Sequence, residues 1–370
     1  MKPFNAIWQK GETSRQAHRD LPEGSYEREI GREGFSGPSS RIYHKRPHTG
    51  WSNIEGELQP RAFNLQNVPE TSEPWESLDV LYNNHVRVSL WNTPKSMSNL
   101  ARNADGDLLL FIHAGDGDLF CDFGHLTVRK GDYIVVPRGT MWRLENEAPM
   151  NVLLVEATNS QYSLPDKGML GTHAIFDPAK LDTPEMDGAF LAQQDESAWT
   201  VKIKKHNKVT IVDFPYNPLD AVGWTGDLVP VRINVDDILP VNSHRYHLPP
   251  SAHSTFMSDR FMVSTFVPRP FETDKTAIKV PFFHNNEDYD EVIFFHAGQF
   301  FSRDHIDVGM MTYHPGGITH GPHPGALKRV FEQPNSHTDE IAVMLDTRDP
   351  LEVSATDYEI EGYSRSWENS

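Results

Sequence analysis

Short apolar runs, separated by glycine, proline, aspartate and asparagine, recur along most of the chain. The first series covers residues 86–91, 108–113, 119–121, 126–128, 133–136 and 152–155. Runs of this length between turn residues are typical of β-strands, and long amphipathic helical patterns are scarce. A second series starts near Val201 and ends near Val353. The pattern predicts an all-β chain with few short helices.

The segments between these series predict the domain organisation. Residues 1–50 are polar and rich in glycine and arginine, which indicates an extended N-terminal arm. Residues 159–197 mix proline, glycine and aspartate, which favours a connector. We therefore expect an arm at 1–50, an N-terminal β half with its connector at 51–200, and a C-terminal β half at 201–370.

Two stretches of the chain are copies of one another. Residues 107–115, DLLLFIHAG, match residues 290–298, DEVIFFHAG, with five identities in nine positions. This alignment places Leu108 opposite Glu291, and its backward extension places Ala101 opposite His284. The proline-glycine turns that follow place Trp142 opposite His320.

The three polar residues of the second copy have a specific chemical interpretation. Two imidazoles and one carboxylate around a metal with open positions form the facial triad that suits non-heme Fe(II), although Zn, Mn or Ni also fit such ligands. A small antiparallel barrel can bring strand ends that are distant in sequence to one ion. His284, Glu291 and His320 are therefore the predicted metal ligands, and the first copy is predicted to be a scaffold.

Other polar residues receive simpler interpretations. His113 and His296 occupy the same place in both copies, which favours a structural role. His323 is an alternative ligand, and His244 and His253 are alternatives to His247, which is discussed below. Solvated strand faces are predicted for Arg138, Arg143, Lys202, Lys204, Lys205 and Lys208.

Composition narrows the class of partner. The chain has 370 residues, with 34 lysines and arginines against 52 aspartates and glutamates, which gives a formal net charge of −18. Such a charge repels nucleic acid and anionic membrane surfaces. A single cysteine, Cys121, excludes an internal disulfide. Since no signal peptide or run of 18 apolar residues is present either, we expect a cytoplasmic protein that acts on small molecules.

Four sequence elements carry a resemblance to known proteins. Residues 124–132, GHLTVRKGD, resemble the turn-strand-turn unit of cupin barrels. HNN at 284–286, the strand that opens at Glu291, and YHPGGITHGP at 313–322 resemble homogentisate 1,2-dioxygenases, which are bicupin Fe(II) enzymes that cleave aromatic rings. The likeness covers most of the chain and is weak between about 160 and 230.

The resemblance implies roles for individual residues. It makes His284, Glu291 and His320 the iron ligands and His314 a nearby histidine that supports them. His247, in YHLPPSAHSTF at 246–256, matches the active-site histidine that hydrogen-bonds a substrate hydroxyl.

The chain also departs from the family pattern. One extra residue separates His284 from Glu291, so Glu287, Asp288 and Asp290 are rival carboxylates. Glu291 is preferred because it alone stands at the head of the duplicated strand without a counterpart carboxylate in the first copy. The family's carboxylate-binding tyrosine and lysine match Phe300 and Arg303 here. An arginine can bind a carboxylate with two hydrogen bonds, so these two residues are the predicted substrate contacts.

The resemblance also sets the expected function. It implies an Fe(II) dioxygenase that uses O2 to open a 1,4-dihydroxylated ring, with homogentisate converted to maleylacetoacetate in aromatic amino-acid catabolism. A trimer or hexamer is expected from the same resemblance. A hydroquinone- or gentisate-type dioxygenase remains an alternative, as does a metal cupin that acts as an isomerase or binds a small molecule.

Overall fold

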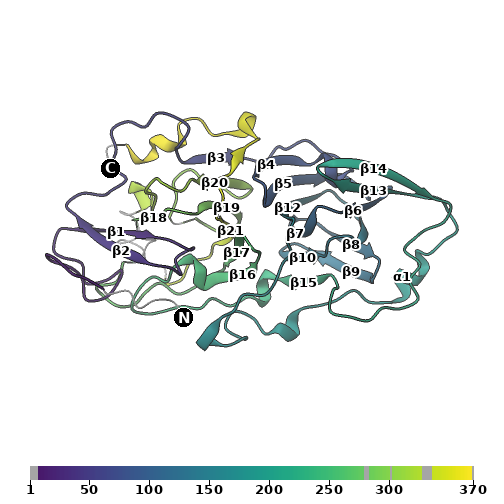
Figure 1. The fold of residues 1–370 in the computed structure, drawn as a ribbon, viewed down its shortest axis with the longest axis horizontal. Helices are drawn as coiled ribbons and strands as arrows, with labels where there is room; N and C mark the ends of the chain where they lie inside the picture. Colours follow the sequence, from purple (N-terminus) through teal and green to yellow (C-terminus); the bar gives the residue numbers. More distant parts are fainter. Residues whose placement is uncertain (1–6, 279–282, 301, 327–335, 369–370) are drawn as a thin grey trace.

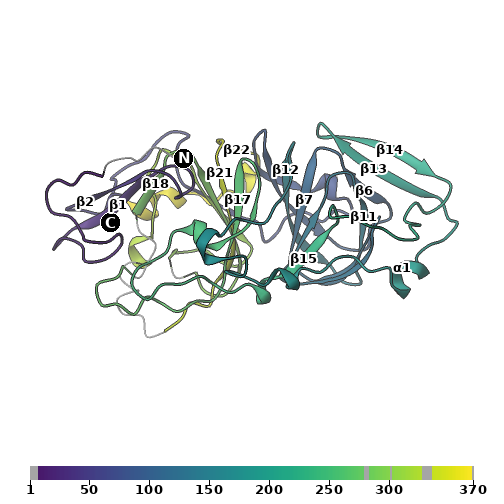
Figure 2. The same cartoon turned by 60° about the horizontal axis from the view of Figure 1, so that its bottom comes forward.

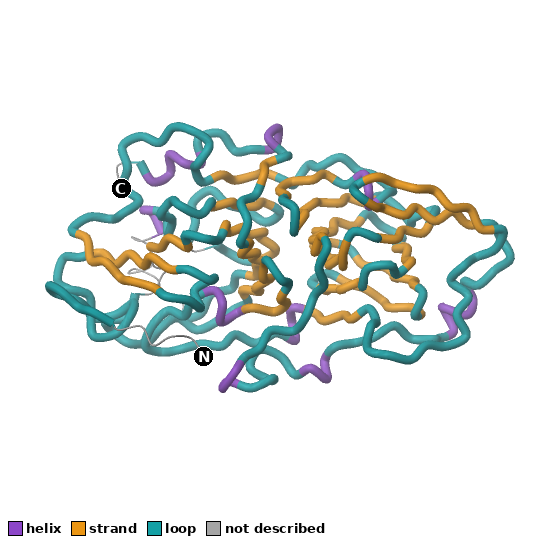
Figure 3. Tube along the Cα trace, in the orientation of Figure 1, coloured by secondary structure: helices purple, strands orange, loops and turns teal. Residues whose placement is uncertain are grey.

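The computed structural model describes residues 7–278, 283–300, 302–326 and 336–368, and it contains two β-rich halves side by side along the long axis (Figures 1 and 2). Strands dominate both halves, and the helical turns lie in the connections (Figure 3). The N-terminal half has a seven-stranded sheet in the order β15 (Val231–Asn234), β10 (Asp132–Val136), β7 (Gly106–Ala114), β12 (Met150–Thr158), β5 (Val86–Thr93), β4 (Leu78–Tyr82) and β22 (Glu352–Val353). Its six-stranded sheet has the order β14 (Lys208–Phe214), β13 (Trp199–Lys205), β6 (Leu100–Asn103), β11 (Met141–Glu145), β8 (Asp116–Cys121) and β9 (Gly124–Arg129).

The C-terminal half has its own six-stranded sheet and a smaller one. The larger sheet has the order β16 (Ser254–Met257), β17 (Phe261–Phe266), β21 (Ile341–Thr347), β19 (Asp290–Ala297), β20 (Met310–His314) and β3 (Arg61–Asn64). The three-stranded sheet has the order β18 (Phe283–Asn286), β1 (Tyr26–Gly31) and β2 (Ser39–His44). The connections contain α1 (Gly188–Ala192) and the 3-10 helices η1 (Pro74–Glu76), η2 (Gly168–Leu170), η3 (Pro178–Lys180), η4 (Val235–Asp237), η5 (Pro250–His253), η6 (Thr356–Tyr358) and η7 (Tyr363–Trp367). Among the described residues, no helix is long and apolar enough to span a membrane.

The apolar runs of the first series all fold as predicted. Each of them lies within β5, β7, β8, β9, β10 or β12. Their side chains fill the interior of the N-terminal half, where one apolar cluster includes Leu108, Ile112 and Trp142. The predicted all-β bicupin architecture is therefore confirmed.

The two copies occupy equivalent places in their sheets. β7 lies between β10 and β12, just as β19 lies between β20 and β21. Ala101 pairs with Trp142 in the first half, and His284 pairs with His320 in the second. These matching pairs confirm the alignment that places Ala101 opposite His284 and Trp142 opposite His320.

The two large sheets share one apolar core, which joins the halves. This core contains residues of both copies, including Leu109, Phe111, Val292 and Phe294. At its edge, His113 Nδ1 and His296 Nδ1 lie 2.9 Å apart. The contacts are reciprocal, since the His296 ring packs on Phe111 at 4.8 Å and the His113 ring on Phe294 at 4.9 Å. This position agrees with the predicted structural role of the two histidines.

The histidine pair leads to a prediction about acid stability. Burial lowers the pKa of His113 to about 4 and that of His296 to about 3, from 6.5. As the pH falls below 6.5, the unfolded chain therefore takes up protons that the folded chain does not. The free energy of unfolding should fall between pH 6.5 and about 4, by about 1.4 kcal/mol per pH unit for each histidine that stays neutral.

Denaturant titrations over that pH range test the prediction. The double variant His113→Gln/His296→Gln has no group to titrate at these positions, so its free energy of unfolding should depend less steeply on pH. An unchanged slope would contradict the contribution of the pair.

Strand pairing crosses the predicted boundaries at residues 50 and 200. β13, β14 and β15 follow the connector and still extend the sheets of the N-terminal half. In the other direction, β3 joins the large sheet of the C-terminal half, and β1 pairs with β18. β22 returns from the end of the chain to pair with β4. The two halves exchange strands, and the division into domains stays a prediction.

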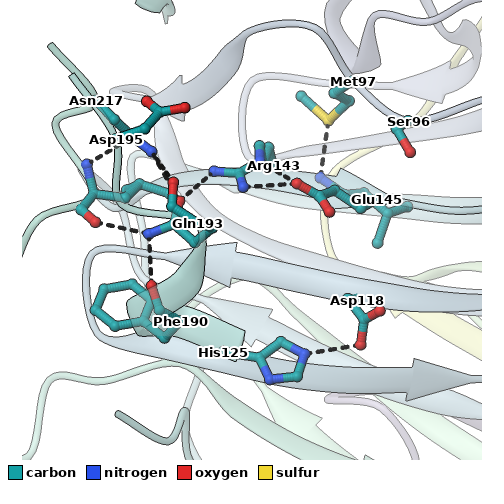
Figure 4. Close-up of polar contacts among 12 residues, drawn as sticks. Ser96, Met97, Asp118, His125, Arg143, Glu145, Phe190, Gln193, Asp195 and Asn217 are labelled. Atoms are coloured by element: carbon teal, nitrogen blue, oxygen red, sulfur yellow. Dashed lines mark hydrogen bonds and ion pairs between the residues drawn. The ribbon is translucent and has the colours of Figure 1, made fainter. Parts of the chain in front are cut away.

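Some charged residues that were predicted to be solvated are buried. Arg143 is 2% exposed and lies between the rings of Phe120 and Trp199, each 4.7 Å from its guanidinium carbon. Figure 4 shows its contacts with Glu145 and with Gln193, which follows α1. Lys204, 5% exposed, donates to Glu156 and Asp105 over 2.5 and 3.1 Å. The prediction of solvated faces was wrong for Arg143 and Lys204.

Candidate metal centre

The structure brings the three predicted ligands together. His284 lies in β18, Glu291 is the second residue of β19, and His320 follows β20 and pairs with His284 through two backbone hydrogen bonds of 2.9 and 3.0 Å. One ligand atom from each residue lies within 4.8 Å of the other two, and all three residues are buried. Among the residues that the structure describes, His284, Glu291 and His320 form the group whose ligand atoms lie close enough together to hold a metal ion.

The separations within the cluster suit a single ion. Glu291 Oε2 lies 3.8 Å from His284 Nε2 and 3.6 Å from His320 Nε2. Both distances are shorter than two metal–ligand bonds of about 2.1 Å, so one ion can contact both atoms of each pair. His320 Nε2 is buried and has no hydrogen-bond partner among the described residues. Buried polar atoms normally have a partner, so a buried imidazole nitrogen without a hydrogen bond is suited to bind a metal ion.

The second carboxylate oxygen of Glu291 has different neighbours. His314 Nδ1 donates to Oε1 over 2.8 Å, and Arg303 Nη2 lies 3.7 Å from the same oxygen. The two carboxylate oxygens therefore have different roles. Oε2 faces the imidazoles of His284 and His320, and Oε1 is held by neighbouring donors. This arrangement leaves Oε2 as the oxygen that would contact an ion.

The protonation states also suit metal binding, which needs neutral imidazoles and an ionised carboxylate. Burial alone would raise the pKa of Glu291, but the charge of His320 and the polar contacts of the carboxylate with His284, His314 and His320 hold this pKa well below its usual range. Burial lowers the pKa of His314 to about 3, and burial with the charge of His284 lowers that of His320.

The rival carboxylates lie outside this cluster. Asp290 points to the other side of β19, where it accepts hydrogen bonds from the Tyr313 hydroxyl and from backbone N–H groups at Gly316 and Leu351. Asp288 accepts from the backbone N–H of Glu33. His323 is also absent from the cluster, and its Nδ1 accepts from the backbone N–H of Asp304.

A cavity opens beside the metal cluster. Its wall combines the polar side chains of the cluster with an apolar surface. The lining residues are His247, Leu248, Pro250, Phe266, Arg269, His284, Glu291, Ile293, Phe295, Ser302, Arg303, Gly321, Glu340 and Ala342. Such a mixture is typical of small-molecule sites, where apolar walls hold the ligand and a few polar groups orient it.

His247, the predicted acid-base residue, lies in this wall. Its Nδ1 contacts Glu272 Oε1 at 3.0 Å, which fixes the ring. Burial would raise the pKa of Glu272, but the hydrogen bond and charge of His247 lower it overall. The alternatives lie elsewhere, since His244 is exposed and His253 packs its ring on Phe266 at 5.4 Å.

The predicted substrate contacts differ in position. Arg303 lines the cavity and donates to the backbone oxygens of Ser302 and Gly321. Phe300 is buried and packs on Phe295, with ring centroids 4.5 Å apart, so it supports the cavity wall from behind. A second arginine, Arg269, also lines the cavity and was not anticipated from the sequence.

The N-terminal arm covers the metal cluster, which the sequence did not indicate. β1 pairs in parallel with β18, with Glu29 opposite His284. The Phe35 ring meets the His284 ring edge-on at 5.1 Å. His48 of the arm contacts the Thr319 hydroxyl at 2.9 Å, next to His320. The arm therefore contacts the surroundings of both histidine ligands.

Another missed residue is Asp346, which pairs with Glu291 across the sheet. It is 1% exposed, and burial together with the charge of Glu291 raises its pKa well above the usual range. The equivalent pair in the first copy is Leu108 with Glu156. The internal alignment could have revealed this acidic position if it had been extended to the following strands.

Comparisons with known proteins show the family of this chain. A family model described as "Homogentisate 1,2-dioxygenase N-terminal" matches residues 74–235. A Saccharolobus solfataricus protein described as "Putative dioxygenase" is 32% identical over 387 residues, which cover 98% of each chain. The chain belongs to the homogentisate 1,2-dioxygenase family.

More distant relatives carry the family's name. The homogentisate 1,2-dioxygenase of Sinorhizobium fredii is 25% identical over 273 residues, which cover 70% of this chain and 59% of that enzyme. The Drosophila melanogaster enzyme is 23% identical over 246 residues, which cover 64% of this chain and 55% of that enzyme. The matches thus span less than two thirds of these family members. Among solved structures, the Escherichia coli protein Ylba covers 80% of this chain and 93% of its own, with 9% identity and a TM-score of 0.38.

Proposed function

We propose that this member of the family is an Fe(II)-dependent dioxygenase that opens a 1,4-dihydroxylated aromatic ring with both atoms of O2. Homogentisate, converted to maleylacetoacetate, is the first candidate substrate. The observation that carries the proposal is the buried cluster of His284, Glu291 and His320 beside a cavity that His247 also lines. Two histidines and one carboxylate form the ligand set of many Fe(II) oxygenases.

The residues of the cavity have separate tasks in this proposal. When bound by the three ligands, Fe(II) supplies open positions for substrate and O2 and acidifies the substrate hydroxyl. His247, whose Nδ1 is held by Glu272, presents its Nε2 as hydrogen-bond partner or base for that hydroxyl. Phe266, Ile293 and Phe295 supply apolar walls for the ring. Their surface also excludes water.

A hydroquinone with an uncharged substituent is a second candidate, for an electrostatic reason. Arg303 lies 3.7 Å from Glu291, and Arg269 lies 2.9 Å from Glu340. Both cavity arginines therefore already face a carboxylate. An acidic substrate would have to compete with these carboxylates, whereas an uncharged ring substituent would not.

Oxygen uptake tests the function. Protein loaded with Fe(II) under anaerobic conditions is mixed with homogentisate, gentisate, hydroquinone or substituted hydroquinones. Uptake of one O2 per ring opened is expected for at least one of them. An isomerase, hydrolase or binding protein built on the same ligands would consume no O2, and that result with every ring would reject the proposal.

Replacing His247 should separate catalysis from metal binding. His247→Ala is expected to keep its iron and to lose turnover by roughly 100-fold or more, because a positioned acid-base group is removed. Metal analysis and steady-state kinetics measure the two effects. His244→Ala is a suitable control because that histidine is exposed. Loss of iron from His247→Ala would instead identify His247 as a ligand.

Replacing Arg303 should reveal the charge of the substrate. If the substrate carries a carboxylate, Arg303→Met should raise its KM by roughly 10- to 100-fold, as expected for a charge-assisted hydrogen bond. The KM of an uncharged hydroquinone should change little. Equal effects of Arg303→Met on charged and uncharged rings would favour the second candidate.

A further inference from the structure

The 3-10 helix η7, near the end of the chain, packs behind the metal cluster. Tyr363 is 6% exposed, and its hydroxyl oxygen lies 3.4 Å from His314 Nε2. The Tyr363 and His314 rings are nearly parallel, with centroids 6.3 Å apart. Trp367 closes the other side, 5.4 Å from the Tyr363 ring and 6.1 Å from the His314 ring. Tyr363 is therefore held in place by aromatic contacts as well as by its hydroxyl.

The chemistry of the donors and acceptors determines which group donates in each of these hydrogen bonds. A carboxylate oxygen can only accept, so His314 Nδ1 must carry the proton that it donates to Glu291. In a neutral imidazole the other nitrogen, Nε2, is then an acceptor. Tyr363 can fill that acceptor with its hydroxyl proton. Arg303, which has donors only, can interact with the same hydroxyl only at its oxygen, so it leaves the hydroxyl proton available for Nε2.

The hydrogen bond that His314 donates affects the orientation of Glu291. Because His314 binds Oε1, the carboxylate cannot turn that oxygen toward the two imidazoles without breaking a 2.8 Å hydrogen bond. Oε2 remains the oxygen near His284 and His320. The orientation of His314 thus determines how the carboxylate is presented.

The first copy shows that this arrangement belongs to the site and not to the barrel. His314 pairs with Glu291 across the sheet, and the equivalent pair in the first copy is Val136 with Leu108. In the first copy, which lacks the predicted metal ligands, both positions of this pair are therefore apolar.

We propose that Tyr363 is a positioning residue that fixes the His314 tautomer and thereby holds Glu291 as a one-oxygen metal ligand. This inference rests on the metal-dependent function proposed above and assigns a role to the C-terminal helix η7. Burial raises the pKa of Tyr363, so the hydroxyl keeps its proton at neutral pH.

Metal binding by the variant Tyr363→Phe tests the role without any turnover. The change removes the hydroxyl and keeps the ring contacts. Affinity for Zn²⁺, measured by chelator competition, should fall by roughly 10-fold or more, as for other groups that orient metal ligands. The visible spectrum of the Co²⁺-loaded protein should change, because the carboxylate gains freedom to bind with both oxygens.

The matched control is Tyr133→Phe. Tyr133 is also fully buried and also loses one hydroxyl contact, 2.9 Å to Thr265, but it lies in the core between the halves. It should lower the melting temperature and leave Zn²⁺ affinity and the Co²⁺ spectrum unchanged. If Tyr363→Phe behaves like this control, the proposal is overturned.

A double-mutant cycle provides a second test that does not depend on one variant. His314→Asn keeps an N–H donor near the position of Nδ1 but has no group that reaches Tyr363. In this background, Tyr363→Phe should have no further effect on Zn²⁺ affinity, because the two residues act in series. Multiplying losses would show independent effects and overturn the proposal.

These measurements also separate the inference from the proposed function. A wild-type protein that binds Zn²⁺ and Co²⁺ but takes up no O2 would reject the dioxygenase proposal and leave the Tyr363 test intact. Normal O2 uptake by the wild type, together with an unchanged Co²⁺ spectrum in Tyr363→Phe, would support the dioxygenase proposal and reject the positioning role of Tyr363.

Discussion

Glu291→Ala should bind no iron and should show no oxygen uptake. The substitution removes the only carboxylate of the described cluster, leaving two buried imidazoles, which are too few ligands to retain the ion. Activity should fall by more than the roughly 100-fold that is typical for groups that only orient ligands. His284→Ala and His320→Ala should behave in the same way. Iron analysis and oxygen uptake measure both effects.

A nearby carboxylate supplies the control. Asp288 is a sequence neighbour of Glu291, but it contacts the N-terminal arm instead of the cluster. Asp288→Ala should therefore retain its iron. The apolar cores should keep all these variants folded, so their circular dichroism should match the wild type. Full iron occupancy in Glu291→Ala, with loss in Asp288→Ala, would show that the ligand assignment is wrong.

Trp142→Ala should cost stability instead of metal. Trp142 stands in the first copy where His320 stands in the second, and it is fully buried. Its ring meets those of Trp75 and Trp91 edge-on at 6.4 and 6.2 Å. Truncation to alanine in such a core should lower the free energy of unfolding by about 3 to 5 kcal/mol. Denaturant titration measures this loss.

Metal affinity is the second measurement on the same variant. Zn²⁺ binding by folded Trp142→Ala should equal that of the wild type, since Trp142 and the metal cluster belong to different halves. Trp142→Phe keeps most of the apolar volume and should cost less than the alanine variant. A stability loss below about 1 kcal/mol for Trp142→Ala would contradict its role in the core, because cavities of this size are costly.

The sequence was sufficient for the fold class and for finding the three residues that the structure brings into one cluster, and their role as metal ligands stays a prediction. Strands such as β7 and β19 are encoded by short apolar runs between turn residues, so local patterning identifies them. The predicted ligands could be recognised because the first copy of the duplicated segment can be compared with the second. Comparing Glu291 with Leu108, and His320 with Trp142, showed which polar side chains the barrel itself does not need.

Other features escaped the sequence because they depend on partners that are distant along the chain. Arg143 and Lys204 look like ordinary surface charges, but polar partners make their burial tolerable, namely Glu145 and Gln193 for Arg143 and Glu156 and Asp105 for Lys204. A charge is buried when its desolvation is offset by ion pairs and hydrogen bonds, which local composition does not reveal.

By itself, the sequence determined the strands, their duplication and the predicted ligand set of His284, Glu291 and His320, because these follow from local patterns and from the comparison of two copies. Only the tertiary structure decided what surrounds the ligands. Phe35 reaches the site from the start of the chain and Tyr363 from its end. The physical reason is that hydrogen bonds and ring contacts form between atoms that meet in space, and the pairing of β1 with β18 and the packing of η7 bring these atoms together.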